Sequence, residues 1–217
     1  MFRQFRPITE GEFFVIAADT STGMSDYCAA QFISKTKIDV PLVYHAKVLA
    51  NDMTNAIFPV LEKIFDITKI KPVIAYERNS GGIFEFERLG GLNRLGKFEL
   101  FKMPKTGNVD NSYPTKLGWD TNTATRPRML SDLKDAVDKR LITVYDKPTI
   151  NEMFSFIISQ TSTSEKAQAE HGSHDDLVMS LAIAWQLYQQ CENPADDNSE
   201  VDLPDDTKSL FKEGGFY

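Results

Sequence analysis

The sequence contains no long apolar run, and its cysteine content is low. The longest apolar stretch, residues 177–188, is interrupted by Ser180 and Gln186 and is too short to span a bilayer. The N-terminal residues lack the apolar segment of a secretory signal. The two cysteines, Cys28 and Cys191, lie far apart and form no Cys-x-x-Cys pair. We therefore expect neither a membrane protein nor a cysteine-based zinc site, and a reduced intracellular compartment is the simpler location.

The net charge of −7 is unevenly distributed along the 217 residues. Residues 191–217 carry eight acidic side chains against two lysines, which leaves residues 1–190 close to neutral. Segments of such composition are usually solvated and disordered. We therefore expect one domain over residues 1–190, followed by an acidic, disordered tail over residues 191–217. The overall charge by itself excludes no class of partner, nucleic acid included.

Local patterns predict an alternation of strands and helices. Residues 13–18 form a continuous apolar run, which is typical of a strand buried on both faces. Further strands are expected at residues 27–34, 41–48, 72–76, 98–102 and 141–145. Helices are expected at residues 51–65, with Asn51 or Asp52 as the N-cap, and at 81–89, 127–140, 149–157 and 174–190. Loops are expected at residues 103–124 and 161–172. Three antiparallel strands followed by strand–helix crossovers predict an α/β fold with a mixed central sheet and helices on both faces.

Acidic residues coincide with the ends of predicted elements. Asp19 follows the first buried strand, and Glu77 follows the strand at 72–76. Asp175 and Asp176 begin the last helix. The carboxyl ends of neighbouring parallel strands meet at one edge of an open α/β sheet, where active sites collect, so we expect these acids to converge there. Taken singly, each has a structural alternative as a turn former, a cap or a partner of a helix dipole.

A group of converging carboxylates is stable only when it is partly protonated or bound to cations. Oxygen ligands with few histidines select Mg²⁺ or Mn²⁺ over zinc. Two such ions about 4 Å apart can activate a water molecule and stabilise the leaving oxygen during phosphodiester cleavage. The acids therefore indicate a nuclease that uses two divalent cations.

The acidic segments resemble the motifs of one family of viral enzymes. Residues 16–23 (IAADTSTG), 73–82 (VIAYERNSGG) and 174–181 (HDDLVMSL) are similar to the acidic motifs in the nuclease domain of tailed-phage terminase large subunits, the DNA-packaging motors. The resemblance spans roughly residues 12–190. It implies a ribonuclease-H-like fold, two divalent metals, and cleavage of double-stranded concatemeric DNA during genome packaging in the host cytoplasm. It also implies three protein partners, namely the ATPase domain of the motor, the small terminase subunit and the portal ring.

The resemblance assigns Asp19, Glu77 and Asp176 as the catalytic, metal-binding triad. Asp175 is adjacent to Asp176 and could be the ligand instead, or could support a second metal. Neighbouring residues of a helix point about 100° apart, so only one of the two can face the cluster directly. We favour Asp176 as that ligand.

Basic side chains gather between residues 102 and 128, a stretch with a net charge of +3. The candidate DNA-binding residues are Lys102, Lys105, Lys116, Arg126 and Arg128, together with Arg78 beside Glu77. Contacts from these residues to phosphates would give binding that is independent of base sequence and sensitive to salt. The structural alternative is an ordinary solvated loop, with Arg78 neutralising the acids.

Residues 91–98 (GLNRLGKF) nearly match the phosphate-binding loop of ATPases. However, Phe98 stands where a Mg²⁺-binding hydroxyl belongs, and a strand rather than a helix is expected to follow. We therefore expect no ATPase site in this sequence. The chain is then either an excised nuclease fragment or a naturally separate nuclease.

Two other functions fit the same residues. A resolvase-type or other ribonuclease-H-like nuclease would use these acids on branched DNA or on an RNA–DNA hybrid. A non-catalytic nucleic-acid-binding or scaffold module would keep the fold without the metals, but the retention of all three acids argues against it. A proofreading exonuclease is disfavoured because Ser21 occupies the position, two residues after Asp19, where a second acid is needed.

Overall fold

The structure is a computed structural model that describes residues 1–21, 27–79, 81–103, 116–161, 164–169 and 175–194. Its centre is a seven-stranded sheet with the order β1-β4-β3-β2-β5-β6, and β9 pairs with β4. The strands of this sheet are β1 (Phe2–Gln4), β2 (Phe14–Asp19), β3 (Cys28–Ser34), β4 (Asp39–Ala46), β5 (Val73–Tyr76), β6 (Glu99–Leu100) and β9 (Thr143–Val144). Strands β1 to β4 pair antiparallel, whereas β5, β6 and β9 join by parallel pairing. The expected mixed sheet is confirmed.

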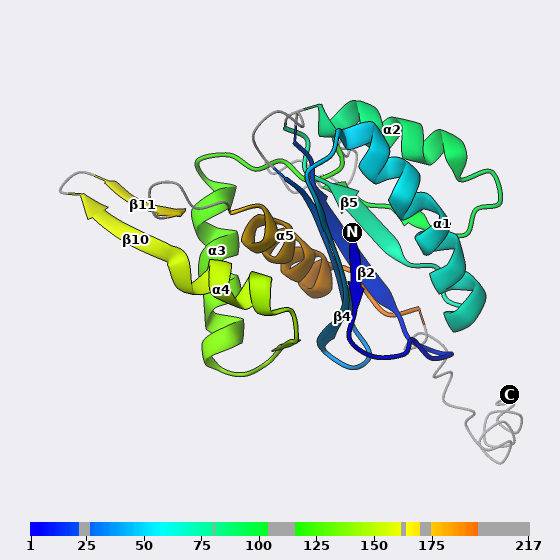
Figure 1. Ribbon diagram of the computed structural model, residues 1–217, viewed down its shortest axis with the longest axis horizontal. Helices are drawn as coiled ribbons and strands as arrows, with labels where there is room; N and C mark the ends of the chain where they lie inside the picture. Colours follow the sequence, from blue (N-terminus) through cyan, green and yellow to red (C-terminus); the bar gives the residue numbers. More distant parts are fainter. Residues whose placement is uncertain (22–26, 80, 104–115, 162–163, 170–174, 195–217) are drawn as a thin grey trace, which may run out of the picture.

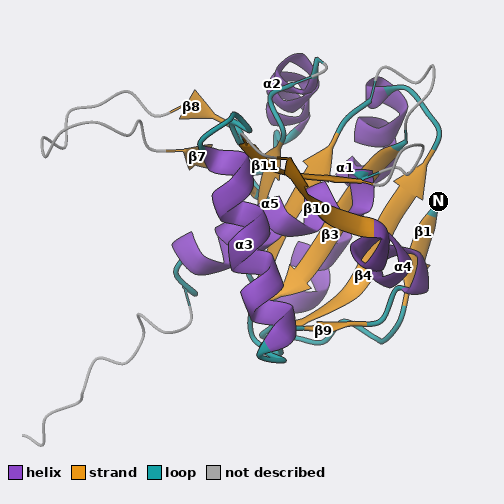
Figure 2. Ribbon diagram, turned by 90° about the vertical axis from the view of Figure 1, so that its left-hand side faces the viewer, coloured by secondary structure: helices purple, strands orange, loops and turns teal. Residues whose placement is uncertain are grey.

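Helices cover both faces of the sheet, also as expected (Figure 1). Helices α1 (Ala50–Thr68) and α2 (Gly82–Leu92) lie on one face, and α3 (Thr125–Asp138), α4 (Lys147–Ser155) and α5 (Asp176–Gln190) lie on the other. Helix α5 packs directly on β2 and β3, and α3 and α4 pack against α5. Figure 2, seen from the side of α3 and α4, shows these two helices in front of the sheet.

Strand β2 is buried along its whole length because it separates two apolar cores. Val15 and Ala17 belong to the core under α5, and Ile16 and Ala18 belong to the core under α1 and α2. Successive side chains of a strand point to opposite faces, so a continuous apolar run supplies both cores at once. The predicted burial of this strand on both faces is confirmed.

An ion network holds the N-terminal segment against the end of the sheet opposite Asp19. The Arg6 guanidinium donates to Asp39 Oδ2 (2.5 Å) and Glu12 Oε2 (2.8 Å), and Lys37 Nζ lies 2.9 Å from Glu12 Oε1. Burial by itself raises the pKa of Glu12, but hydrogen bonds from Arg6, Thr9 and Lys37 outweigh it and lower this pKa to about 2. The buried Glu12 carboxylate is therefore ionised and paired at neutral pH.

Several local predictions were wrong. Both predicted loops contain strands, because β7 (Lys102–Met103) pairs with β8 (Lys116–Leu117), and β10 (Phe156–Thr161) pairs with β11 (Ser164–Ala169). β7 and β8 are only two residues long, and neither β10 (FIISQT) nor β11 (SEKAQA) alternates apolar and polar residues along its whole length, so no local pattern predicted them; pairing with a partner strand satisfies their backbone groups. The predicted strand at 98–102 is divided between β6 and β7. Edge strand β1 was not anticipated.

The predicted cap of the first helix was also wrong. Helix α1 begins at Ala50, and its N-cap is Leu49 rather than Asn51 or Asp52. The extended backbone of Leu49 places its carbonyl oxygen 3.1 Å from the N–H groups of both Asp52 and Met53. Backbone geometry thus starts this helix without the polar N-cap side chain that the prediction assumed.

No helix within the described ranges is long and apolar enough to cross a membrane. The acidic segment expected to be a tail lies almost entirely outside the described residues, which end at Pro194. The boundary at residue 190 coincides with the last residue of α5.

Candidate active site

Asp19 and Glu77 lie next to each other at the carboxyl edge of the sheet. Strands β2 and β5 are parallel, and their register pairs Ala18 with Tyr76. The following residues are therefore level, and the Glu77 N–H donates to the Ala18 carbonyl oxygen at 2.8 Å. Asp19 is 9% exposed and Glu77 is 7% exposed. Two carboxyl groups are thus held side by side in a largely buried position.

Helix α5 brings Asp176 to the same edge. Asp176 is the first residue of the helix and is 9% exposed. The buried side chain of Gln31, on β3, donates to the carbonyl oxygen of Leu177 (3.3 Å) and to Thr149 Oγ1 (3.0 Å). This amide fastens the start of α5 and the start of α4 to the middle of the sheet. The sequence-predicted acids are therefore brought together from β2, β5 and α5.

Burial together with the proximity of the other acids raises the pKa of Asp19 well above its usual value. Burial is the largest cause, followed by the charge of Glu77 and a side-chain hydrogen bond with Glu77, and then by the charges of Asp176 and Asp175. The folded protein therefore holds a proton on Asp19 more tightly than an isolated aspartate would, and a bound cation would relieve the same repulsion.

The two adjacent aspartates at the start of α5 have different environments. The Asp175 carboxylate accepts a hydrogen bond from Arg126 Nη2 at 2.5 Å, and both side chains are about one-third exposed. Asp176 is far less exposed and contributes more than Asp175 to the raised pKa of Asp19. Asp176 thus lies deeper in the cluster, whereas Asp175 lies at its rim and is neutralised by Arg126.

The conformation around Glu77 depends on its neighbours in the segment 77–82. Asn79 Nδ2 donates to Glu77 Oε1 at 3.2 Å and so orients the carboxylate. Gly82, the first residue of α2, passes so close to the strand end that a Cβ there would lie 1.9 Å from the Glu77 carbonyl oxygen. Only glycine fits at this point of contact. The sequence signal for it was the pair of glycines after Glu77, which predicted a helix start but not this close contact.

Glu152 is an acidic residue near the cluster that the sequence did not reveal. It lies on α4, and its Oε1 accepts a hydrogen bond from the Val178 N–H at 2.8 Å. Burial raises the pKa of Glu152 to about 7; the Val178 hydrogen bond opposes this shift, and the charge of Asp176 adds to it. No motif surrounds Glu152 in the sequence, because its role depends on how α4 packs against α5.

The acids supply oxygen ligands of the kind that Mg²⁺ and Mn²⁺ prefer. Among the described residues, no group of three or more His, Cys, Asp or Glu side chains is already arranged as a metal-binding site. Asp19 is instead hydrogen-bonded to Glu77, and Asp175 is paired with Arg126. A bound cation would have to replace one or both of these contacts.

The basic candidates lie around this edge in different settings. Lys102 and Lys116 are exposed on the paired strands β7 and β8, and Lys116 Nζ lies 2.7 Å from Asp120 Oδ2. Arg128 is largely exposed on α3. Arg78 Nη1 donates to the Leu117 carbonyl oxygen at 2.5 Å, so one of its donors holds β8 beside the end of β5. The remaining candidate, Lys105, lies outside the described residues.

Comparison with solved structures identifies the fold, whereas no family model matches the sequence. The large terminase nuclease of thermophilic phage G20c, crystallised with bound cobalt, superimposes with a TM-score of 0.61 at 19% identity, over 88% of this chain and 86% of that chain. The large terminase nuclease domain of Thermus phage P74-26 gives 0.57 at 15% identity, over 88% and 86%. A human cytomegalovirus terminase nuclease domain, soaked in manganese and inhibitor-bound, gives 0.53 at 10% identity, over 82% and 83%. The fold is therefore the ribonuclease-H-like fold of large terminase nuclease domains.

Proposed function

We propose that this protein is a metal-dependent endonuclease that cleaves double-stranded concatemeric DNA during viral genome packaging. The single observation that carries the proposal is the convergence of Asp19, Glu77 and Asp176 at the carboxyl edge of a sheet with this fold. A structural role does not explain why three carboxyl groups are buried together, because their mutual repulsion costs stability. A role in binding divalent cations does explain it.

Asp19, Glu77 and Asp176 would hold Mg²⁺ or Mn²⁺, and Asp175 would help to hold a second ion. When bound, such ions act as Lewis acids that activate water and stabilise the leaving oxygen of a phosphodiester. The chain's own residues prepare the site for this chemistry. Asn79 orients the Glu77 carboxylate, and Gln31 fixes the helix that carries Asp176.

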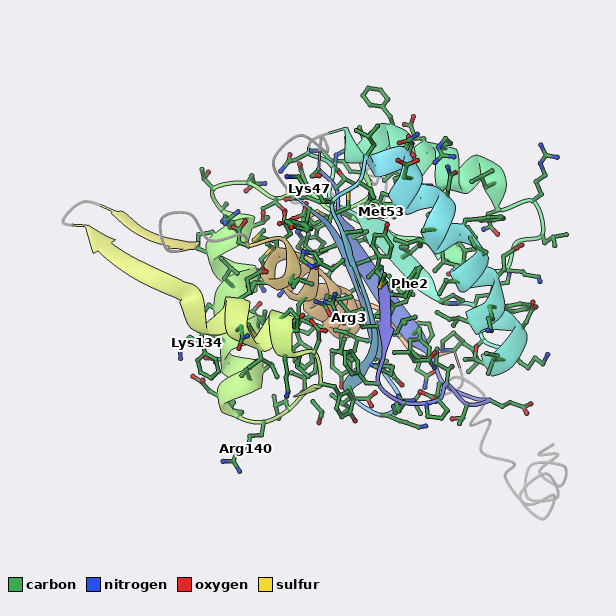
Figure 3. The ribbon with its side chains drawn as sticks, viewed as in Figure 1. Phe2, Arg3, Lys47, Met53, Lys134 and Arg140 are labelled. Atoms are coloured by element: carbon green, nitrogen blue, oxygen red, sulfur yellow. The ribbon has the colours of Figure 1, made fainter. Side chains whose placement is uncertain are left out.

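Basic residues around the same edge would bind the DNA backbone. Lys102 and Lys116 lie on β7 and β8, Arg126 and Arg128 lie on α3, Arg78 follows Glu77, and Lys105 follows β7 in the sequence. Charge reversal at Lys102 or Lys116 should weaken duplex binding. It should also reduce the slope of the logarithm of affinity against the logarithm of salt concentration by about 1 for each phosphate that the protein no longer neutralises. Arg140, labelled in Figure 3, follows the C-terminal end of α3, whereas Arg126 lies in the first turn of that helix; Arg140 is therefore a matched control.

The test of the proposed activity is cleavage of supercoiled plasmid and linear duplex with Mn²⁺, with Mg²⁺ and with EDTA. We expect Mn²⁺-dependent cleavage by the wild type and none by Asp19→Asn. Asp66→Asn, at an exposed position paired with Lys97, should cleave like the wild type. Failure of the wild type to cleave with either metal would favour a non-catalytic binding module instead.

The same assay distinguishes the two classes of nuclease. A packaging nuclease should cut linear duplex at least as well as a four-way junction of the same length. Strong preference for the junction would favour a resolvase-type enzyme. Association with the packaging ATPase domain, the small terminase subunit and the portal ring, and action in the host cytoplasm, follow from the proposed function and are part of the proposal.

A further inference from the structure

The first turn of α5 is capped from another helix. The N–H groups of the first turn of any helix have no partner within the helix, and the side chain of the N-cap residue usually accepts from the second or third of them. In α5 these are the N–H groups of Leu177 and Val178. Both donate to the carboxylate of Glu152 on α4, and the bond from Val178 measures 2.8 Å.

The N-cap residue itself does not perform this role. Asp175 is the N-cap of α5 and belongs to a residue type that caps helices well. Within the part of the chain that the structure describes, its carboxylate makes no capping hydrogen bond to the helix. It is turned instead toward Arg126, 2.5 Å away. Glu152 therefore supplies the capping acceptor that Asp175 would ordinarily provide.

Helix α4, which carries Glu152, is itself tied to the sheet at its first turn. Asp146 Oδ2 accepts from the N–H and the hydroxyl of Thr149, at 3.0 and 2.7 Å. Asp146 also forms an ion pair with Arg3 at 2.5 Å, and Thr149 accepts from Gln31. Figure 3 shows Phe2 and Arg3 of β1 on opposite sides of that strand, with Arg3 on the side of α4. Glu152 is thus presented to α5 from a helix whose start is held in place.

We propose that Glu152 is a positioning residue of the candidate active site, which caps α5 in place of Asp175. The cap fixes the direction of the first helical turn, so that Asp176 is held toward Asp19 and Glu77. It also leaves the Asp175 carboxylate available to Arg126 or to a divalent cation. This inference rests on the proposed function, since it assigns Glu152 a part in building the same metal site.

The test compares Glu152→Ala, which removes the acceptor, with Glu152→Gln, which keeps an acceptor oxygen and removes the charge. Mn²⁺ binding is measured by electron paramagnetic resonance and cleavage is measured on plasmid. Residues that orient metal ligands typically change metal affinity by about 10- to 100-fold when they are altered. We expect Glu152→Ala to weaken Mn²⁺ binding by about 10-fold or more, and Glu152→Gln to stay within about threefold of the wild type.

A control separates positioning from reduced stability. Gln186, in the second half of α5, donates to Asp132 Oδ2 at 2.9 Å and is buried. Gln186→Ala should destabilise α5 while leaving Mn²⁺ affinity within about twofold of the wild type. Amide hydrogen exchange of the metal-free variants measures directly whether the capped N–H groups are protected. Exchange at Leu177 and Val178 should accelerate in Glu152→Ala and should return toward the wild-type rate in Glu152→Gln.

The outcomes are distinguishable. The positioning role would be overturned if Glu152→Ala bound Mn²⁺ as tightly as the wild type does. It would also be overturned if Glu152→Gln and Glu152→Ala weakened Mn²⁺ binding equally, because the acceptor oxygen would then have no effect on metal affinity. Unchanged exchange at Leu177 and Val178 in Glu152→Ala would overturn the cap itself. A wild type that neither binds Mn²⁺ nor cleaves DNA would overturn the proposed function, and the assignment of Glu152 to a metal site would fall with it.

Discussion

Replacement of Asp19 by asparagine should make the metal-free protein more stable while it abolishes cleavage. Asp19 is buried against Glu77, and burial, followed by the charges of the acids that would bind a metal with it, raises its pKa. A raised pKa in the folded state means that the folded protein binds a proton more tightly than the unfolded chain does. The stability that this tighter proton binding contributes is fully present below the usual pKa of an aspartate, about 3.8, and is lost as pH rises through the pKa of Asp19 in the folded protein.

The expected size of the effect follows from the electrostatics of the pair. Two ionised carboxylates about 4 Å apart repel each other by about 4 kcal/mol at an effective dielectric constant of about 20. Retention of a proton relieves part of this repulsion, so we expect Asp19→Asn to stabilise the metal-free protein by about 1–3 kcal/mol near pH 8. Asparagine has nearly the same volume as aspartate, and its amide can donate to Glu77. In a domain of this size 1 kcal/mol corresponds to a shift in Tm of about 2–4 °C.

The assay is thermal unfolding followed by circular dichroism at pH 4, 6 and 8, in EDTA and in Mn²⁺. In EDTA the advantage of Asp19→Asn should be small at pH 4 and should grow toward pH 8. In Mn²⁺ the wild type should gain stability, by about 2.7 kcal/mol when the free metal is 100 times its Kd, and Asp19→Asn should gain less. Asp66→Asn serves as the exposed control and should show neither effect. A lower Tm for Asp19→Asn than for the wild type in EDTA at pH 8 would refute the reasoning.

Three further predictions concern the site and the sheet. Asp176→Asn should reduce cleavage at least about 100-fold and Asp175→Asn less, because Asp176 lies deeper in the cluster; an active Asp176→Asn enzyme would contradict this order. Gly82→Ala should destabilise the protein in chemical denaturation by about 2 kcal/mol or more, because its Cβ would meet the Glu77 carbonyl, and wild-type stability would show that no such contact exists. Arg6→Ala should cost about 2–4 kcal/mol at pH 7, because it leaves the buried carboxylate of Glu12 paired with lysine alone. Since the pKa of Glu12 is lowered to about 2, this difference should shrink as pH falls from about 4.5 toward 2, and a pH-independent difference would count against the network.

Under the proposed function, the pairing of Asp175 with Arg126 would link DNA binding to cation binding. Arg126 is both a candidate phosphate contact and the partner of Asp175. A phosphate that attracted the Arg126 guanidinium would release the Asp175 carboxylate at the rim of the cluster. DNA and a divalent cation would then strengthen each other's binding, because each removes a competitor of the other.

The sequence by itself determined the parts of the site that follow from local pattern. A continuous apolar run predicts a strand buried on both faces, and an acid at its end must lie at the edge of the sheet. This reasoning located Asp19 and Glu77, and the apolar stripe of the last helix placed Asp175 and Asp176 at its start. Local pattern sufficed because each of these positions is set by the strand or helix that carries it.

Only the tertiary structure decided what each side chain contacts. The different environments of Asp175 and Asp176 depend on Arg126, which lies 49 residues earlier in the chain, and the cap from Glu152 spans 26 residues. The pairing of β10 with β11 and the addition of β1 to the sheet depend likewise on partners that a local pattern does not contain. A hydrogen bond or ion pair between distant residues forms only after the helices and strands have packed. For this reason the sequence could name the acids of the site, but their order of burial and the residues that orient them came from the fold.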